Sequence, residues 1–494
     1  MKSTVRLSLA LLALLAGACT SGGGSPSCNT NDGLPLAGDA AVTPAPGTSP
    51  TPGTLPDAAP WPKFRHDNAN TGNANTGRAA DDPHVITLSE NTGQILWQFP
   101  PANESGKGPF ATSPAVINVC ANSGTPCTGN PDCSDSAPCT ARVFIGAADG
   151  SFYALDGGTG SLVFSYSTAA SAITNSPAVD TSGRAFFNTT LNQLLRLTPT
   201  GFLDRAAAVG GYSASSPALA TDGTAMVGAF ISAQSGISGA VCTNGIARWS
   251  LGEGSVQAAP ALGPDGITGT QVANCTVSSD TAPHGLVYVA ESRPHPAVRA
   301  IDRCLGHIRW TFIASDPVVA APLLELQPTA TDPRAGTVYI FDGGGHLFAI
   351  DAESGAAAFG DSFSLPFTKP GPLPNVSSPA LGANGVLYLG STDGNLYAFD
   401  PTTGATRSFQ TGGPIQSSIA VAGNAIVFGS NDGNVYQVTD DGTELTEVWH
   451  VAITVPGTEG PVPIALGRSS PAIGLDGTVY IGAADGRVYA IGTP

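Results

Sequence analysis

Residues 142–164 read Arg142-Val-Phe-Ile-Gly-Ala-Ala-Asp-Gly-Ser-Phe-Tyr-Ala-Leu-Asp-Gly-Gly-Thr-Gly-Ser-Leu-Val-Phe164. Large apolar residues alternate on both sides of Asp149-Gly150, and this pattern predicts a two-residue hairpin turn that needs positive φ. A second turn is predicted at Thr159-Gly160, and the strand after it ends on an aromatic residue. The stretch therefore predicts a unit of short antiparallel strands joined by tight turns.

The same unit recurs along the chain, with further copies at 386–404, 425–436 and 478–491. Each copy follows a short Ser-Pro-Ala strand; such strands start at Ser113, Ser176, Ser216, Ser378 and Ser470, with degenerate versions at Ala259, Ala321 and Ser417. These starts recur at intervals of roughly 40 to 60 residues, which is typical of a β-propeller. The prediction is an all-β, eight-bladed β-propeller of four-stranded antiparallel blades, with seven blades as the alternative.

A second series of residues supports this count. Glycines recur at the predicted last turn of the blades, at positions 93, 160, 201, 245, 306, 355 and 404. An aromatic residue follows most of these turns; the set is Trp97, Phe164, Trp249, Trp310 and Phe359, with Trp449 after a longer turn. A large flat side chain between two sheets removes much apolar area from water, so these residues are predicted to dock one blade on the next.

The phrase Ala-x-Asp-x-x-Thr-Gly-x-x-x-Phe at 154–164 resembles the repeat of the pyrroloquinoline-quinone (PQQ) type of propeller. Residues 61–72 resemble the segment that precedes the first blade in those chains, so the resemblance covers about 61–494. That family contains quinoprotein dehydrogenases and also noncatalytic scaffolds such as the BamB-like outer-membrane lipoproteins. The resemblance implies the fold strongly and the activity weakly.

The two ends of the repeat array are complementary. The last copy stops at Ile491, before its fourth strand, whereas residues 84–97 carry a fourth-strand phrase with no blade before it. Pairing of the two segments would close the ring and remove an exposed sheet edge.

The N-terminus has the features of an export signal. Residues 1–18 have a basic start and an apolar run too short to span a bilayer. Leu15-Ala-Gly-Ala-Cys19 resembles the bacterial lipoprotein signal, which implies lipidation of Cys19; an ordinary secreted disulfide cysteine is the alternative. Residues 20–60 are rich in Gly, Ser, Pro and Thr and predict a flexible tether between the lipidated Cys19 and the propeller at 61–494.

Eight cysteines remain after Cys19, an even number in an exported chain. Four of them lie in a polar insertion at 120–139 and predict two local disulfides, with a zinc site as the alternative; they are Cys120, Cys127, Cys133 and Cys139. Cys242, Cys275 and Cys304 are further disulfide candidates, and Cys28 lies in the tether. The seven propeller cysteines fall in first or third turns of their blades, which predicts that they share one face of the ring.

Composition limits the possible partners. Only 12% of the residues are charged, and the net charge is −17. This argues against a basic surface for nucleic acid and fits a soluble acidic exterior. The propeller is expected to be monomeric and to meet the membrane only through its lipid anchor.

The sequence contains no recognisable catalytic motif. It lacks a zinc-protease helix motif, a Gly-x-Ser-x-Gly elbow and a phosphate-binding loop. The dehydrogenases that it resembles hold PQQ between a tryptophan and a disulfide of adjacent cysteines, beside calcium. This chain has no adjacent cysteines, and its tryptophans are assigned to blade docking and the lead-in. No catalytic residue, metal or cofactor is therefore predicted; a PQQ- and calcium-dependent oxidoreductase is the enzymatic alternative.

One hairpin departs from the Asp-Gly pattern. The fourth blade has Glu291, Arg293 and His295 in a longer turn, which is a candidate contact site for a ligand or partner peptide. The alternative is a degenerate turn stiffened by two prolines.

The resemblance implies a noncatalytic protein-binding scaffold, lipid-anchored at the outer membrane and bound to other envelope proteins. Recognition of a small ligand or glycan in the central funnel is the alternative function.

Overall fold

The computed structural model describes residues 72–75, 85–127, 132–133, 137–169, 171–209, 215–220, 225–228, 238–241, 247–250, 255–263, 285–293, 295–303, 305–327, 336–358, 363–364, 377–458 and 460–494. The predicted signal peptide, Cys19 and the tether lie outside these residues, as do Cys242, Cys275, Cys304 and Phe359.

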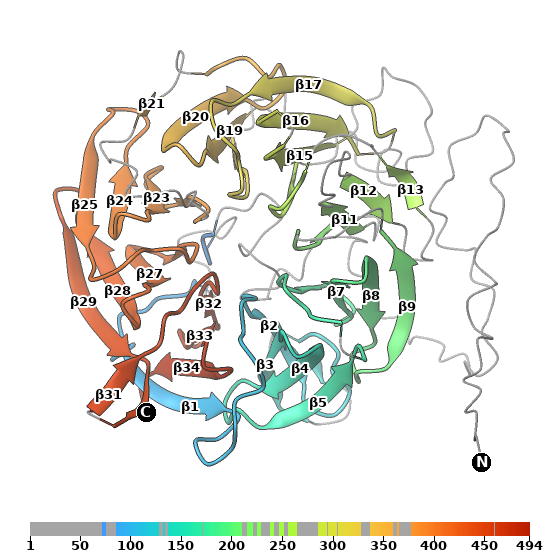
Figure 1. Ribbon diagram of the computed structural model, residues 1–494, viewed down its shortest axis with the longest axis vertical. Coiled ribbons are helices and arrows are strands. Elements are labelled where there is room, and N and C mark those ends of the chain that lie inside the picture. The colour runs from blue at the N-terminus through green and yellow to red at the C-terminus, as the bar shows by residue number, and fades with distance from the viewer. Residues whose placement is uncertain are drawn as a thin grey trace, which may run out of the picture.

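The described residues form antiparallel four-stranded sheets arranged in a ring (Figure 1). Blade 1 contains β2 (Ala115–Cys120), β3 (Cys139–Gly146), β4 (Ser151–Asp156) and β5 (Leu162–Ser167). Blade 2 contains β6 (Ala178–Val179), β7 (Ala185–Thr189), β8 (Gln193–Leu197) and β9 (Leu203–Ala208). Blades 3 and 4 contain β10 (Ala218–Leu219), β11 (Ala225–Gly228), β12 (Ser238–Val241), β13 (Ala247–Ser250), and β14 (Ala261–Leu262), β15 (Leu286–Glu291), β16 (Ala297–Asp302), β17 (Ile308–Ile313).

Blades 5 and 6 contain β18 (Leu323–Leu326), β19 (Gly336–Phe341), β20 (His346–Asp351), β21 (Phe363–Ser364), and β22 (Ala380–Leu381), β23 (Leu387–Gly390), β24 (Asn395–Phe399), β25 (Thr406–Gln410). Blade 7 contains β26 (Ala420–Ala422), β27 (Ala425–Gly429), β28 (Asn434–Asp440) and β29 (Leu445–Ala452). A separate hairpin of β30 (Thr454–Gly457) and β31 (Gly460–Pro463) follows blade 7.

The count of eight equivalent blades needs a qualification. Among the described residues, seven sheets are built from four consecutive strands, and one further four-stranded sheet, named blade 8 here, is assembled from both chain ends. It contains β32 (Ala472–Ile473), β33 (Val479–Gly482), β34 (Val488–Gly492) and β1 (Gln94–Phe99). Trp97 pairs with Ala490, so the N-terminal strand closes the ring as the sequence indicates.

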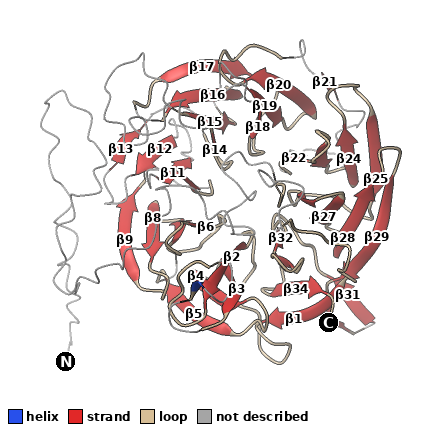
Figure 2. Ribbon diagram, turned by 180° about the vertical axis from the view of Figure 1, so that it is seen from behind, coloured by secondary structure: helices blue, strands red, loops and turns tan. Residues whose placement is uncertain are grey.

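The first strand of each blade lies nearest the centre and the fourth lies at the rim (Figure 2). Around the centre, the Ser-Pro-Ala motif forms a seam of hydrogen bonds. The Ser113 backbone N–H donates to the Ser176 hydroxyl at 2.8 Å, and Ser470 donates to Ser113 in the same way at 2.8 Å. The seam also contains Ser176 to Ser216, Ala321 to Ser378, Ser378 to Ser418, and Ser418 to Ser470. The motif therefore joins neighbouring blades as well as starting strands.

The lead-in contacts the inner part of the ring. Asn73 forms a parallel bridge with Val421 of β26, and its side-chain amide donates to the Leu381 carbonyl of blade 6 at 2.9 Å. This segment therefore ties blade 6 to blade 7.

Near the outer strands, the predicted docking aromatics pack on the turn glycine of the next blade. A Cβ at Gly160 would lie 2.5 Å from the Trp97 ring, and one at Gly355 would lie 2.6 Å from Trp310. Phe164 packs on Gly201 and Trp449 packs on Gly93 in the same manner. These glycines also have positive φ, so both the backbone conformation and the adjacent ring exclude a side chain. The side chains of Trp249 and Phe359 are outside the described residues.

The turn type predicted for the Asp-Gly hairpins is wrong. Gly150 N–H donates to the Ala147 carbonyl and Ala147 N–H donates to the Ser151 carbonyl, which makes a three-residue loop. Only Gly150 of this loop has positive φ, as expected for a type I turn closed by a glycine bulge. An Asp-Gly pair is compatible with both turns, because each places the glycine in a left-handed conformation.

Candidate functional site

The predicted contact site at the fourth hairpin is not assembled. Glu291 is 3% exposed, and its carboxylate forms an ion pair with Arg299, with 2.9 Å between Glu291 Oε1 and Arg299 Nε. Arg293 and His295 are exposed, and the Arg293 carbonyl accepts a hydrogen bond from Ser255 N–H at 2.7 Å. Glu291 is the last residue of β15 and is buried beside Arg299 of β16, so it belongs to the blade interior and not to a surface shared with Arg293 and His295.

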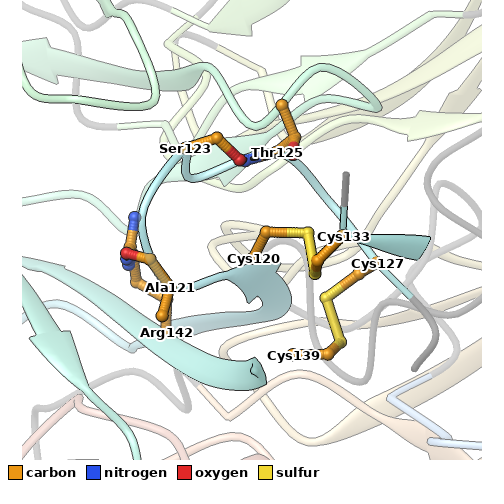
Figure 3. The surroundings of a disulfide bond; sticks show 8 residues. All are labelled: Cys120, Ala121, Ser123, Thr125, Cys127, Cys133, Cys139 and Arg142. Carbon is orange, nitrogen blue, oxygen red and sulfur yellow. Dashed lines mark hydrogen bonds between the residues drawn. A yellow bond between two sulfur atoms is a disulfide. The ribbon is translucent and has the colours of Figure 1, made fainter. Parts of the chain in front are cut away.

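Two disulfides close the cysteine-rich insertion at 120–139, which we call the stapled loop. Cys120 bonds to Cys133 and Cys127 bonds to Cys139 (Figure 3). This confirms two local disulfides and excludes the zinc alternative, since the bonded sulfurs are not thiolates.

The stapled loop also packs on blade 2. Gly124 lies against Pro199 in the third turn of blade 2, and Gly183 in the first turn lies against the Gly124 carbonyl. Arg142 donates to the Ala121 carbonyl at 3.3 Å, and burial lowers the pKa of this guanidinium despite the attraction of Asp156. First and third turns therefore share a face, as predicted, and the loop is held to a neighbouring blade.

The sequence reasoning missed a repeated feature of the rim. Two residues after the turn glycine, four outer strands carry an aliphatic side chain that is exposed; these are Ile95, Leu162, Leu203 and Ile308, at 42%, 49%, 46% and 37% exposure. Val163 and Phe202 are also exposed, at 43% and 73%. The signal in the sequence was the spacing Gly-x-(Ile/Leu), which is hidden beside the more conspicuous aromatic two residues later.

Three of these outer strands are consecutive around the ring. The strands β1, β5 and β9 belong to blades 8, 1 and 2 and follow one another around the rim, from the bottom to the right side in Figure 1. Each is the last strand of its sheet, so its outer backbone edge has no strand partner among the described residues. We call Ile95, Leu162, Val163, Phe202 and Leu203 the rim patch.

The repeat fold agrees with a comparison with protein families. A family model described as outer membrane protein assembly factor BamB matches residues 251–407 and 369–493. The chain is a BamB-like β-propeller of PQQ-type repeats. No curated protein matches its sequence.

Solved structures resemble this BamB-like propeller at low sequence identity. The quinohemoprotein alcohol dehydrogenase from Comamonas testosteroni has 12% identity and a TM-score of 0.60, covering 89% of this chain and 81% of its own. A europium-containing methanol dehydrogenase has 14% identity and a TM-score of 0.57, covering 87% of this chain and 91% of its own. Sqt1 from Saccharomyces cerevisiae has 12% identity and a TM-score of 0.57, covering 82% of this chain and 100% of its own. At these identities the likeness shows the propeller fold alone.

Within the described residues, no helix has the length and apolar character needed to cross a bilayer.

Proposed function

We propose that this BamB-like propeller is a noncatalytic scaffold, lipid-anchored through Cys19 in the bacterial envelope, that binds another envelope protein at the rim patch. The observation that carries the proposal is the repeated exposure of aliphatic side chains on the consecutive outer strands β1, β5 and β9. The description of the matching family as an outer-membrane assembly factor supports the outer membrane as its location.

The chemistry of the rim patch favours a protein ligand. Exposed apolar groups that recur on neighbouring elements favour an interaction site, and these three strands also offer the backbone donors and acceptors of their outer edges. An extended segment of a partner would add to such an edge through main-chain hydrogen bonds, while Leu162 and Val163 contact its side chains. Only 12% of the residues are charged, so apolar contact is expected to dominate affinity, while the net charge of −17 disfavours an acidic partner.

The experiment places a photo-crosslinking residue at Val163 in the full chain expressed in its native envelope. The expected result is one stoichiometric crosslinked envelope protein, which is lost in the double variant Leu162→Glu, Leu203→Glu. Leu326→Glu is the matched control, because Leu326 is also 40% exposed but lies on β18, an inner strand of blade 5.

Two results would contradict the scaffold. One is crosslinking that is unaffected by the double variant. The other is absence of a partner together with thermal stabilisation by a sugar or quinone library, which would support a ligand in the central funnel. Dye reduction on addition of PQQ, calcium and an alcohol would support the oxidoreductase instead.

A further inference from the structure

Blade 5 has an unusual hairpin between its second and third strands. In blades 1, 6, 7 and 8 this hairpin has a shared arrangement, in which an Asp accepts a hydrogen bond from a Tyr four residues later; the pairs are Asp149–Tyr153, Asp393–Tyr397, Asp432–Tyr436 and Asp485–Tyr489. In blade 5 the equivalent residues are Gly344 and Phe348. The alignment rests on the turn hydrogen bond, in which Gly345 N–H donates to the Asp342 backbone carbonyl as Gly394 N–H donates to the Ser391 carbonyl in blade 6.

The carboxylate missing from this hairpin is supplied by the connector from blade 4. Gly343 N–H donates to the Pro317 carbonyl, and in blade 7 Asn431 N–H donates to the Pro414 carbonyl in the same way. Pro317 is therefore equivalent to Pro414, and the residue before it, Asp316, is equivalent to Gly413. A Cβ on Gly344 would overlap the Asp316 carboxylate. The Asp and the Gly have therefore exchanged places between hairpin and connector, and the exchange leaves room for Asp316 above the hairpin.

A second carboxylate and an imidazole face the same point. Asp342, whose side chain is fully buried, lies 3.0 Å from His346 Nδ1 through its Oδ2 atom. His346 Nδ1 also lies 4.0 Å from Asp316 Oδ2. One ligand atom from each of the three residues lies within 4.8 Å of the others. The equivalents of Asp342 in blades 6 and 7 are Ser391 and Ser430, and within the part of the chain that the structure describes such a grouping of Asp and His is found in blade 5 alone.

We propose that Asp316, Asp342 and His346 bind a divalent transition metal of the zinc type. Zinc binds imidazole nitrogen at about 2.0–2.1 Å and carboxylate oxygen at about 2.0–2.2 Å, which places tetrahedral ligand atoms about 3.3 Å apart. The observed separations of 3.0 and 4.0 Å bracket this value. One nitrogen and two carboxylates with water in the remaining position suit zinc, whereas calcium requires six to eight oxygen ligands.

The cation would take the lone pair of His346 Nδ1, in the tautomer whose single ring proton is on Nε2. Two carboxylates balance the charge of a divalent ion, and a neutral imidazole that binds it through Nδ1 keeps its single proton on Nε2, so this imidazole releases no proton on binding. The role would be structural, because the ion would tie the connector leaving blade 4 to the hairpin of blade 5. Residue 321 is an alanine, so the serine seam offers no hydroxyl from blade 5 at this junction.

The test is zinc titration of the mature full chain, without a polyhistidine tag or reductant, after EDTA treatment and dialysis. Calorimetry at pH 7.5 should show one site per chain. The variants His346→Asn and Asp316→Asn should lose more than the roughly 10–100-fold in affinity that removal of a second-shell group costs. Asparagine is tolerated at this hairpin position, because Asn395 and Asn434 occupy it in blades 6 and 7.

The matched control is His450→Asn. His450 Nδ1 lies 2.7 Å from Glu447 on the exposed strand β29, which makes an imidazole and carboxylate pair without a third described ligand. Zinc affinity and the zinc-induced rise in melting temperature should be unchanged in this variant. Equal zinc binding by His346→Asn and the wild type, or no one-to-one binding by the wild type, would overturn the proposal.

Discussion

The junction between blades 4 and 5 and the junction between blades 6 and 7 have the same place in the repeat but different chemistry. At the first, Trp310 Nε1 and the Tyr288 hydroxyl donate to one carbonyl, that of Ala352, at 3.1 and 3.0 Å. The rings of Tyr288 and Trp310 are 5.8 Å apart at 40°. Blade 8 repeats this arrangement on blade 1, where Trp97 and Tyr480 have the same separation and angle and share the Gly157 carbonyl.

At the junction between blades 6 and 7, an ion pair takes the place of the indole. The Tyr388 hydroxyl donates to Asp440 at 2.9 Å, and Arg407 contacts the same carboxylate through Nε at 3.1 Å and through its terminal nitrogen. Asp440 has a side-chain exposure of 1%. Each of these two junctions therefore has a pair of hydrogen-bond donors, which includes an indole at the first and a guanidinium at the second. The two solutions should differ in their response to mutation and to pH.

The largest effect is expected for Trp310→Ala. The change removes a buried indole and both its contact with Gly355 and its hydrogen bond, leaving a void between two sheets. We expect a loss of roughly 3–5 kcal/mol, as for other large aromatic truncations. The fall in melting temperature by calorimetry measures it. Phe202→Ala is the control, because Phe202 is 73% exposed, and an equal fall in both variants would contradict docking by Trp310.

Arg407→Ala should have the next largest effect. It leaves the Asp440 carboxylate buried without its cation, which costs about 3–5 kcal/mol for a fully buried pair and about 2–3 kcal/mol here, since Arg407 is partly exposed. Denaturant unfolding measures the loss. Arg184→Ala is the control, because its pair with Asp180 is more exposed, with side-chain exposures of 31% and 15%.

The stability loss caused by Arg407→Ala should depend on pH, whereas the loss caused by Trp310→Ala should not. Burial alone would raise the pKa of Asp440, but hydrogen bonds from Arg407, Gly442 and Tyr388 outweigh it and lower the pKa of this carboxyl. Its contribution to stability is therefore present above the unfolded pKa of about 3.9 and is lost as pH falls through the lower folded value. The difference between wild type and Arg407→Ala should shrink from pH 7 to pH 3, while that for Trp310→Ala persists. Parallel behaviour of both variants would remove the distinction between the junctions.

The stapled loop should matter less to the ring than either junction. Each bridge closes a loop of about a dozen residues and is expected to stabilise that loop by roughly 2–4 kcal/mol. Blades contact mainly their neighbours, so the effect should remain local. Changing Cys120, Cys127, Cys133 and Cys139 to serine should leave a folded propeller with new proteolytic cleavage within 121–138. Global unfolding of this variant, or free thiols at these positions in protein from the native envelope, would contradict the expectation.

The sequence predicted the features that repeat and missed those formed between repeats. The turn glycines and Trp97, Trp310 and Trp449 could be assigned because their spacing recurs. Arg407 and Asp440 are separated by 33 residues, and nothing in their local sequence indicates that they meet. Glu291 was placed on the surface because a charged residue beside a turn is usually exposed, whereas pairing with Arg299 allows it to be buried.

The smallest effect is expected in the Asp-Gly hairpins. Blade 5 is a natural variant of these hairpins, because Phe348 stands in the tyrosine position. The Tyr397 hydroxyl donates to Asp393 Oδ2 at 2.7 Å, while Asp393 Oδ1 accepts the Asn395 backbone N–H at 2.8 Å. Tyr397→Phe removes only the first bond and should cost about 1 kcal/mol. Burial raises the pKa of Tyr397, and the adjacent Asp393 carboxylate raises it further. The cost of Tyr397→Phe should therefore be constant from pH 7 to about pH 9, below the unfolded pKa of about 10, and should fall at higher pH as the unfolded tyrosine ionises. Asp393→Asn should couple to this change in a double-mutant cycle, because both act on one bond. Phe348→Tyr supplies the reverse control, made together with Asp316→Ala because the Asp316 carboxylate lies against Gly344. Without a carboxylate in that place, the added hydroxyl should bring no stabilisation, and a gain equal to the loss in Tyr397→Phe would show that the tyrosine acts without its aspartate.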